Sequence, residues 1–363
     1  MALFVPRKIA TVTKPTPNSN EKFYELPKPS GKPPYHLALN SIIPVQDAGG
    51  IEFHIVGDTG DTKTSQAQHM VEAAMEADFD KNKISFLYHV GDVIYKFGEA
   101  SEYYSQFYES YAHYPAPIFA IPGNKDGDVR TGSNVPSLAA FVNNFCATRQ
   151  QVTPDALEIN RDAMIQPNVY WTLDAPFVTI IGLYSNVPDG GVIKPDQFQW
   201  FVKELVSASP DKALIIAVHH APFSADDEHS GSDTILQVLD KAFEESKRLP
   251  NIVVSGHVHN YQRFTRKLDK HQIPYIVLGN GGHWKLHHMQ RHNGAQIKTP
   301  FKLQDRDDAV LGKYCDDKYG FMRLHVTPHK LVGKFYCTAL PHQPVKKIDE
   351  FRLDLQKHRL DTR

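Results

Sequence analysis

Residues 83–95 read KISFLYHVGDVIY and contain the pattern that decides the fold. A short run rich in aliphatic and aromatic residues, 83–90, ends at Gly91 and is followed directly by Asp92. Such a run, closed by a glycine, is typical of a strand buried within a sheet. In open α/β sheets, binding groups gather at the carboxyl ends of the strands. The stretch therefore predicts a buried strand that delivers Asp92 to the edge of a sheet.

The same pattern recurs along the chain and alternates with longer amphipathic stretches. Short apolar runs occupy 51–57, 83–91, 116–123, 177–184, 213–220, 251–257 and 274–280. Helix-like segments lie between some of them, at 64–78, 99–111, 195–208 and 231–247. Alternation of strands and helices on this scale predicts an α/β fold, in which helices cover central sheets.

The two ends of the chain differ from this pattern. Residues 1–48 are rich in proline, which fixes φ and removes a hydrogen-bond donor, so we expect an extended surface arm or a partly disordered one. Residues 319–337 predict an antiparallel hairpin that turns at Pro328-His329. The charged segment 345–363 is most simply interpreted as a solvated helix. The chain therefore divides into an arm (1–48), one central domain (49–340) and a charged tail (341–363).

Composition limits the classes of partner. Of the 363 residues, 41% are hydrophobic, which is enough for a sizeable core. The formal net charge is −1, so there is no general electrostatic reason to expect a nucleic-acid or anionic-membrane partner. The three cysteines are widely spaced and lack a CxxC pair, which indicates neither a zinc knuckle nor a dense disulfide framework, although one bridge is possible.

The beginning of the chain indicates no export signal. It contains no apolar run long enough for a signal peptide, and no stretch approaches the roughly 18–20 apolar residues that span a bilayer. The sequence predicts a soluble protein that is cytoplasmic by default, or secreted if a leader has been removed. The oligomeric state stays open.

Several expected strands end in a side chain that can bind a metal ion. The candidates are Asp58, Asp92, Asn124, His220, His257 and His259. Each one alone has an ordinary explanation, because Asp and Asn often cap helices or turns and a single histidine usually has a structural role. Turn chemistry does not explain six such side chains in order at strand ends. Carboxylate and imidazole together suit two ions of Fe, Zn or Mn, which can clamp a phosphate ester and lower the pKa of a bound water.

Five short motifs contain these candidates: GDTG (57–60), GDVIY (91–95), GNKD (123–126), AVHHAP (217–222) and GHVH (256–259). Together they resemble the five-block signature of the calcineurin-like metallophosphoesterases. Gly60 and Tyr95 narrow the resemblance to the purple acid phosphatase branch, which lacks a histidine in the first block and uses a tyrosine ligand instead. The resemblance covers residues 51–337. It implies a four-layer α/β/β/α sandwich, with 49–340 as the catalytic domain.

The resemblance also implies a ligand set for two metal ions. The first ion would be bound by Asp58, Asp92, Tyr95 and His259, and the second by Asn124, His220 and His257, with Asp92 bridging the two. His220 is preferred to His219 because it has the H-x-P spacing of the motif. A phenolate at Tyr95 would suit Fe(III), with Fe(II), Zn or Mn as the second ion.

Other histidines are candidates for contact with substrate. His229 lies nine residues after His220, where the family places a substrate-contacting histidine that could protonate the leaving group. A solvated loop histidine is an equal alternative. His283 could form part of the pocket rim. For the cluster His287, His288 and His292 we favour a surface patch over a place at that rim.

Lys125 is the main departure from the family motif, which has a histidine at this position. Lysine has three donors and no acceptor, so it cannot replace a neutral imidazole. It could act as a proton donor or phosphate clamp, or it could point to solvent while His229 provides the acid. A third possibility is that hydrolysis has been lost while metal binding remains.

The sequence thus predicts a dinuclear metallophosphatase of small phosphomonoesters, acid phosphatase-like, with a metal-bound hydroxide as nucleophile. Its catalytic residues would be His229 and Lys125, and Asn124, His229 and His283 would contact substrate. One alternative is a phosphodiesterase or nucleotide pyrophosphatase on the same metal site. Another is a non-hydrolytic phosphate-binding or regulatory protein, suggested by Lys125 alone.

Overall fold

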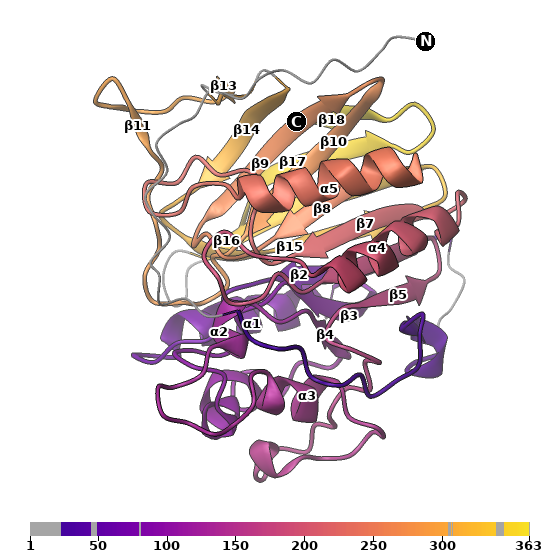
Figure 1. Cartoon of the computed structure of the whole chain (residues 1–363). Coiled ribbons are helices and arrows are strands. Elements are labelled where there is room, and N and C mark those ends of the chain that lie inside the picture. The colour runs from indigo at the N-terminus through magenta and orange to yellow at the C-terminus, as the bar shows by residue number, and fades with distance from the viewer. Residues whose placement is uncertain are drawn as a thin grey trace.

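Two β-sheets pack face to face in the computed structural model, which describes residues 23–44, 49–79, 81–303, 306, 308–338 and 345–362 (Figure 1). The nine-stranded sheet contains, in spatial order, β1 (His36–Ala38), β5 (Trp171–Ala175), β6 (Val178–Leu183), β7 (Ala213–Val218), β8 (Ile252–Ser255), β10 (His271–Leu278), β9 (Tyr261–Leu268), β14 (Ala309–Cys315) and β13 (Phe301–Lys302). The seven-stranded sheet contains β18 (Arg359–Thr362), β17 (Lys346–Asp354), β16 (Lys330–Thr338), β15 (Tyr319–Val326), β2 (Ile51–Val56), β3 (Ile84–His89) and β4 (Ile118–Ala120). A small ribbon, β11 (Arg291–His292) with β12 (Ala295–Gln296), lies apart from both.

Helices cover the outer faces of the two sheets. On the nine-stranded sheet, α4 (Pro195–Ser207) and α5 (Asp233–Ser246) lie side by side (Figure 1). On the other sheet, α1 (Gln66–Phe79) packs against β15 and β16. Two shorter helices, α2 (Asn124–Gly127) and α3 (Ala139–Phe145), follow β4. The fold is an α/β sandwich, as the sequence predicts.

Aromatic side chains fill the space between the sheets. The ring of Tyr261 in β9 stacks on Phe335 in β16 with centroids 3.8 Å apart. Trp171 in β5 stacks on Tyr88 in β3 at 6.1 Å. All four side chains are fully buried. Each such burial stabilises the fold by about 1.5–3 kcal/mol before packing terms are added, so these contacts hold the sheets together.

The parallel strands of both sheets end near one another. In the seven-stranded sheet β2, β3 and β4 run parallel, and in the other sheet β6, β7, β8 and β10 do so. All seven predicted strands are present, as are the helices expected over 64–78, 195–208 and 231–247. The expected hairpin is β15 with β16, and its turn contains Pro328 and His329.

The segment 99–111 is not the regular helix that the sequence predicts. It forms a 3₁₀ turn, Ala100–Glu102, and then a wider π-helical turn, Tyr104–Tyr108. The π turn places the buried side chain of Gln106 against the backbone of Tyr95. Its Oε1 accepts a hydrogen bond from the N–H of Tyr95 at 2.7 Å, and its Nε2 donates to the carbonyl of Tyr95. The departure from α-helical geometry therefore supports a candidate metal ligand.

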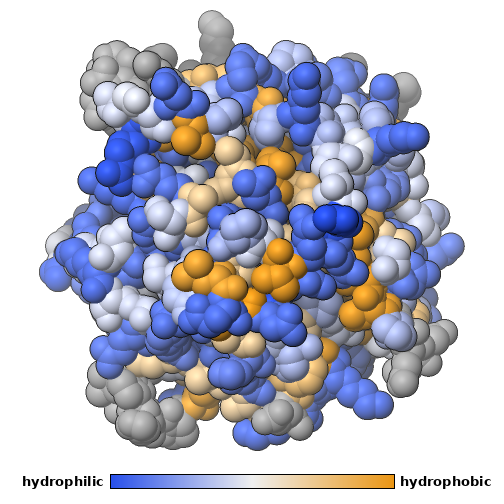
Figure 2. Space-filling view, turned by 90° about the horizontal axis from the view of Figure 1, so that it is seen from below, coloured by the Kyte–Doolittle hydropathy of each residue, from blue (hydrophilic) through white to orange (hydrophobic). Residues whose placement is uncertain are grey.

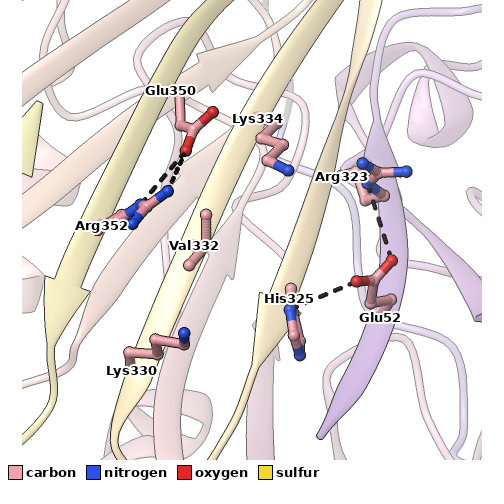
Figure 3. Close-up of a pocket in the computed structure, with 8 residues that line it drawn as sticks. All are labelled: Glu52, Arg323, His325, Lys330, Val332, Lys334, Glu350 and Arg352. Atoms are coloured by element: carbon pink, nitrogen blue, oxygen red, sulfur yellow. Dashed lines mark hydrogen bonds and ion pairs between the residues drawn. The ribbon is translucent and has the colours of Figure 1, made fainter. Parts of the chain in front are cut away.

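The prediction of a solvated helix at the end of the chain is wrong. Residues 346–354 and 359–362 are the strands β17 and β18, at the edge of the seven-stranded sheet. Phe351 and Leu353 are buried, whereas Arg352 lies on the outward face (Figure 3). This alternation has the period of a strand, and the high charge of the segment conceals it. The charged side chains pair with each other, as Arg352 does with Glu350 at 3.0 Å.

The outward face of this sheet has a cavity of about 160 Å³ (Figure 3). It is lined by Glu52, Arg323, His325, Lys330, Val332, Lys334, Glu350 and Arg352. Glu52 lies near the start of β2. Its Oε1 is 3.4 Å from Nδ1 of His325, and its Oε2 is 3.8 Å from Nε of Arg323. None of the predicted site residues lines this cavity, because they follow the opposite end of β2.

Part of the predicted arm, residues 1–22 and 45–48, lies outside the described residues. Within the remainder, the N–H of Tyr24 donates to Oδ1 of Asn186 at 3.1 Å, and β1 adds a parallel strand beside β5. Cys146, Cys315 and Cys337 are buried free thiols.

The surface is mainly hydrophilic on the face that Figure 2 shows, with apolar side chains in small groups. Exposed large apolar residues in the described part of the chain include Leu157, Val206 and Trp284. Single residues of this kind are ordinary on soluble folds. Among the described helices, none has the length and apolar character needed to cross a bilayer.

Candidate metal centre

The predicted ligands meet at one place, where the parallel strands of the two sheets end. From the seven-stranded sheet come Asp58 after β2, Asp92 after β3 and Asn124 after β4; from the nine-stranded sheet come His219 and His220 after β7, and His257 and His259 after β8. Most of these side chains are fully buried, and none is exposed. Burial of so many polar groups is costly unless they are paired or bind an ion.

Three of the ligands predicted for the first metal lie in direct contact. The hydroxyl of Tyr95 donates to Oδ1 of Asp58 at 3.2 Å and lies 3.3 Å from Nε2 of His259. Nε2 of His259 is also 3.6 Å from Oδ1 of Asp58. Because Nδ1 of His259 donates to the carbonyl of Lys285 at 3.0 Å, the lone pair of the neutral ring is on Nε2, which faces the cluster.

The second group forms around Asn124. Its Oδ1 lies 3.2 Å from Nδ1 of His257 and 3.1 Å from Nε2 of His219. The ring of His220 is 4.4 Å from that of His257. The two groups join through Asp92, whose Oδ1 is 3.4 Å from Nε2 of His219. This position suits the bridging role that the sequence predicts for Asp92.

The structure also brings in His219, which the sequence reasoning passed over in favour of His220. One donor atom each from Asp58, Asp92 and His219 lies within 4.8 Å of the others. Nδ1 of His219 donates to the carbonyl of Val90 at 2.9 Å, so its Nε2 faces the carboxylates. The signal in the sequence was the His-His doublet, of which only one member fitted the motif.

His220 has a different and informative environment. Its Nδ1 is 2.6 Å from Oγ of Ser185, while its Nε2 is buried and has no hydrogen-bond partner among the described residues. A buried imidazole nitrogen without a partner is unfavourable unless it binds something. This atom fits a metal ligand, and the choice of His220 as the ligand stays a prediction.

Three of these positions have strained backbones. Asp58, Asp92 and His257 have φ values of 56°, 54° and 68°, in the left-handed region that L-residues rarely adopt. Each such residue costs on the order of 1–3 kcal/mol and typically marks a functional site. The N–H of His257 donates to Oδ2 of Asp58 at 2.9 Å, which ties two strained positions together across the sheets.

Glycines precede the ligands because side chains would not fit there. A Cβ on Gly123 would lie 2.1 Å from Oδ1 of Asp92, and one on Gly256 would lie 2.4 Å from Oδ2 of Asp58. Both distances are far below van der Waals contact, so these glycines allow backbone and carboxylate to approach closely.

Three of the candidate histidines have lowered pKa values, which favour the neutral form that binds a metal cation. Burial, followed by the charges of other histidines, lowers the pKa of His220, His257 and His259 well below the usual value, so these rings are neutral near pH 7. Neutral imidazole is the form that binds metals. His219 differs, because Asp92 outweighs the effect of burial and raises its pKa to about 9.

Asp58 and Tyr95 need a nearby positive charge in order to be ionised. Burial raises the pKa of Asp58 well above its usual value, and Asp92 adds to this effect. Burial and the two carboxylates likewise raise the pKa of the Tyr95 phenol. A phenolate here therefore requires a cation beside it. The residues present fit a dinuclear metal site of mixed carboxylate, imidazole and phenol donors.

Asp126 organises the loops that carry two of the ligands, a role that the sequence did not reveal. Its buried carboxylate accepts hydrogen bonds from the N–H groups of Gly123, Val93 and Ile94, at 2.8, 3.1 and 3.2 Å. Burial, together with the charge of Asp92, raises the pKa of Asp126 to about 7. The sequence signal for this role was the aspartate at the fourth position of the motif GNKD, residues 123–126.

The predicted substrate residues border the ligands. The ring of His229 lies 4.7 Å from that of His257. The ring of His283 lies 4.3 Å from that of His259 and 4.4 Å from that of Tyr95. Lys125 is half-buried and donates its N–H to Oδ1 of Asp92 at 2.8 Å.

The surface-patch prediction is wrong for His287. This residue is buried, and its ring stacks on that of His259 with centroids 4.4 Å apart. His288 and His292 are exposed, as expected. Two adjacent histidines in a sequence do not show which of them points inward. In the structure His287 is buried and His288 is exposed.

The comparisons with known proteins agree with this geometry. The sequence profile of the calcineurin-like phosphoesterases matches residues 51–261. The chain belongs to this family. Its relatives include purple acid phosphatase 21 of Arabidopsis thaliana, with 22% identity over 287 residues, and the probable purple acid phosphatase 20 of the same plant, with 30% identity over 125 residues.

The matches cover unequal parts of these chains. The first covers 77% of this chain and 58% of purple acid phosphatase 21, and the second 32% of this chain and 28% of its relative. Among solved structures, GAP50, the anchor in the inner membrane complex of Plasmodium, matches with a TM-score of 0.54 and 13% identity, over 82% of this chain and 88% of its own. PhoD matches with the same TM-score and identity, over 88% and 72%. At this identity the two structures show the fold alone. Family membership and the donor set support a metal-dependent phosphoester hydrolase.

Proposed function

We propose that the chain is a dinuclear metal-dependent phosphatase that hydrolyses small phosphomonoesters. The observation that carries the proposal is the convergence of the ligands from five strand ends into one buried cluster. The unpartnered Nε2 of His220 and the buried carboxylate of Asp58, whose pKa is raised by burial, support it, because each is unfavourable without a cation beside it.

Asp58, Asp92, Tyr95 and His259 would hold one ion, and Asn124, His220 and His257 the other, with Asp92 between them. When bound, the ions would activate water and stabilise the charge that develops on the phosphoryl group. His219 lies close enough to Asp92 and Asn124 to orient both.

The residues at the edge of the centre have separate roles in this proposal. Lys125 lies near enough to Asp92 for its charge to help lower the pKa of that carboxyl; His219 has the larger lowering effect, and the two outweigh burial, which raises the pKa. It would hold the phosphate as a cation. His229, whose ring lies against that of His257, would contact the phosphate and donate the proton to the leaving alkoxide. His283, against Tyr95 and His259, would contact the ester.

Iron at the Tyr95 side of the centre is part of the proposal. Phenolate bound to Fe(III) gives a visible charge-transfer band. An iron-loaded sample should therefore be coloured, and the band should disappear in Tyr95→Phe. A ferric protein without colour would contradict the assignment of Tyr95.

The activity is tested with two esters. Purified protein is loaded with Fe, Zn or Mn and assayed with p-nitrophenyl phosphate and bis-p-nitrophenyl phosphate across a pH series. We expect turnover of the monoester, and faster hydrolysis of the diester would identify a phosphodiesterase or nucleotide pyrophosphatase instead. Tight phosphate binding without turnover of either ester would refute both readings and support the non-hydrolytic alternative that Lys125 raises.

A further inference from the structure

The loop between β7 and α5 is fastened to the loop after β10 through one buried carboxylate, Asp226. This side chain is 1% exposed. Its Oδ1 accepts hydrogen bonds from the N–H of Glu228 at 2.8 Å and from the N–H of His229 at 2.6 Å. Its Oδ2 accepts from Nδ2 of Asn260 at 2.8 Å. Asp226 thus connects its own loop to the segment that follows β8.

The second loop is attached through the same residue. The carbonyl of Asp226 accepts from Nε2 of Gln290 at 2.9 Å. Asn260, directly after the candidate ligand His259, donates to the carbonyl of His287 at 3.1 Å as well as to Asp226. The two loops also pair by backbone, since the N–H of Gln290 donates to the carbonyl of Ala225 at 2.8 Å.

These attachments bring His287 against the candidate centre. Its ring lies 5.0 Å from that of His229 and stacks at 4.4 Å on that of His259. Its Nδ1 is 3.5 Å from Oδ1 of Asp226, and its Nε2 is 3.5 Å from Oε2 of Glu228. The N–H of His287 donates to the carbonyl of His259 at 3.0 Å. His287 therefore forms one wall of the space beside His229.

We propose that Asp226 is a positioning residue that fixes His229, and with it His287, in the geometry needed to hold the phosphate at the metal centre. Within the described part of the chain, the carboxylate of Asp226 forms no hydrogen bond or ion pair with a candidate metal ligand, so it acts through His229 and Asn260. A carboxylate that accepts two successive N–H groups fixes the backbone that carries the His229 ring. Small displacements of such a group reduce the rate strongly, because binding groups must sit within a fraction of an ångström of their working position.

The proposal rests on the proposed function for its kinetic readout, but phosphate binding tests it separately. Metal-loaded wild type, Asp226→Ala, His229→Ala and the double variant are compared by calorimetric titration with inorganic phosphate and by steady-state kinetics with p-nitrophenyl phosphate. Metal content is measured for every sample. Asp227→Ala is the matched control, because Asp227 is the exposed neighbour in the same loop.

We expect Asp226→Ala to weaken phosphate binding by about 10–100-fold while metal content stays at the wild-type level. The loss of phosphate affinity in the double variant should be smaller than the sum of the two single losses, because Asp226 acts mainly through His229. Asp227→Ala should match the wild type. If Asp226→Ala does not fold, Asp226→Asn enters the same cycle, since it removes the charge and the acceptor for Asn260.

Three results would overturn the inference: additive losses in the double variant, loss of metal in parallel with phosphate affinity, or an Asp226 variant that matches Asp227→Ala. A wild type that binds phosphate without hydrolysing either ester would refute the proposed function alone. The phosphate-affinity cycle would then still decide the role of Asp226.

Discussion

Replacing Asp349 by alanine should destabilise the whole domain. Asp349 lies in β17, within the segment that its charge made look like a solvated tail, yet its carboxylate reaches across the sandwich to β9. Its Oδ2 accepts from Nε of Arg263 at 2.6 Å and from the hydroxyl of Tyr261 at 2.6 Å, and its Oδ1 accepts from Nη2 of Arg263 at 3.0 Å. The side chains of the ion pair are 3% and 5% exposed.

The magnitude follows from what the substitution leaves behind. Without Asp349, the guanidinium of Arg263 is buried and unpaired, and the hydroxyl of Tyr261 has lost its acceptor. Breaking a buried pair by removing one partner costs about 3–5 kcal/mol, and an unsatisfied hydroxyl adds about 1 kcal/mol. We therefore expect Asp349→Ala to lower the free energy of unfolding by about 4–6 kcal/mol.

Urea denaturation followed by tryptophan fluorescence measures this change. The matched control is Asp174→Ala, which breaks the pair of Asp174 with Lys212, whose side chains are 49% and 28% exposed. Surface pairs of this kind contribute about 1 kcal/mol or less. A loss in Asp349→Ala no larger than that of Asp174→Ala would refute the conclusion that the buried pair of Asp349 with Arg263 holds β17 to β9.

Four further outcomes are expected. Burial, with the adjacent glutamate on α1, raises the pKa of Glu72 to about 9, so Glu72 stabilises the fold less as pH rises from 4.5 towards 9. Glu72→Gln should accordingly stabilise the protein by about 1–3 kcal/mol at pH 8 and by almost nothing below pH 4 in urea unfolding, while Glu244→Gln, at an exposed position of α5, should change the free energy of unfolding at neither pH. Gly123→Ala should lower metal content at least about tenfold by direct measurement, because its Cβ would collide with Asp92. Lys125→Ala should raise KM about tenfold and alter kcat less, and a kcat loss alone would identify it as a proton donor instead. Chelation should lower the melting temperature, and readdition of metal should restore it.

The sequence was sufficient for the seven predicted strands and for the positions of the proposed ligands at strand ends, because both are local signals. A run such as 83–90 shows its burial by its own side chains, and Asp92 shows its place by following that run. The order of the motifs also indicated that six separate side chains meet where strands end, although the structure divides them between the ends of two sheets.

The sequence was insufficient where a residue's role depends on a distant partner. The charge of 345–363 hid a strand because Asp349 is neutralised by Arg263, which lies 86 positions away. His287 could not be told from His288, since only the packing against His259 separates them. The role of Asp126 could not be predicted, because it depends on which backbone N–H groups donate hydrogen bonds to its carboxylate.

The metal centre lies across the seam between the two sheets, and this links metal affinity to the packing of the core. Asp58, Asp92 and Asn124 come from one sheet and the histidines from the other. Neither half offers a complete set of the proposed ligands, so a metal ion would bind the packed sandwich and not the separated sheets. At a free concentration of 100 times Kd, one ion stabilises the native state by about 2.7 kcal/mol. That energy offsets the strain at φ 56°, 54° and 68° for Asp58, Asp92 and His257. In the metal-free protein those three residues are held by packing and by hydrogen bonds, such as the one from His257 to Asp58.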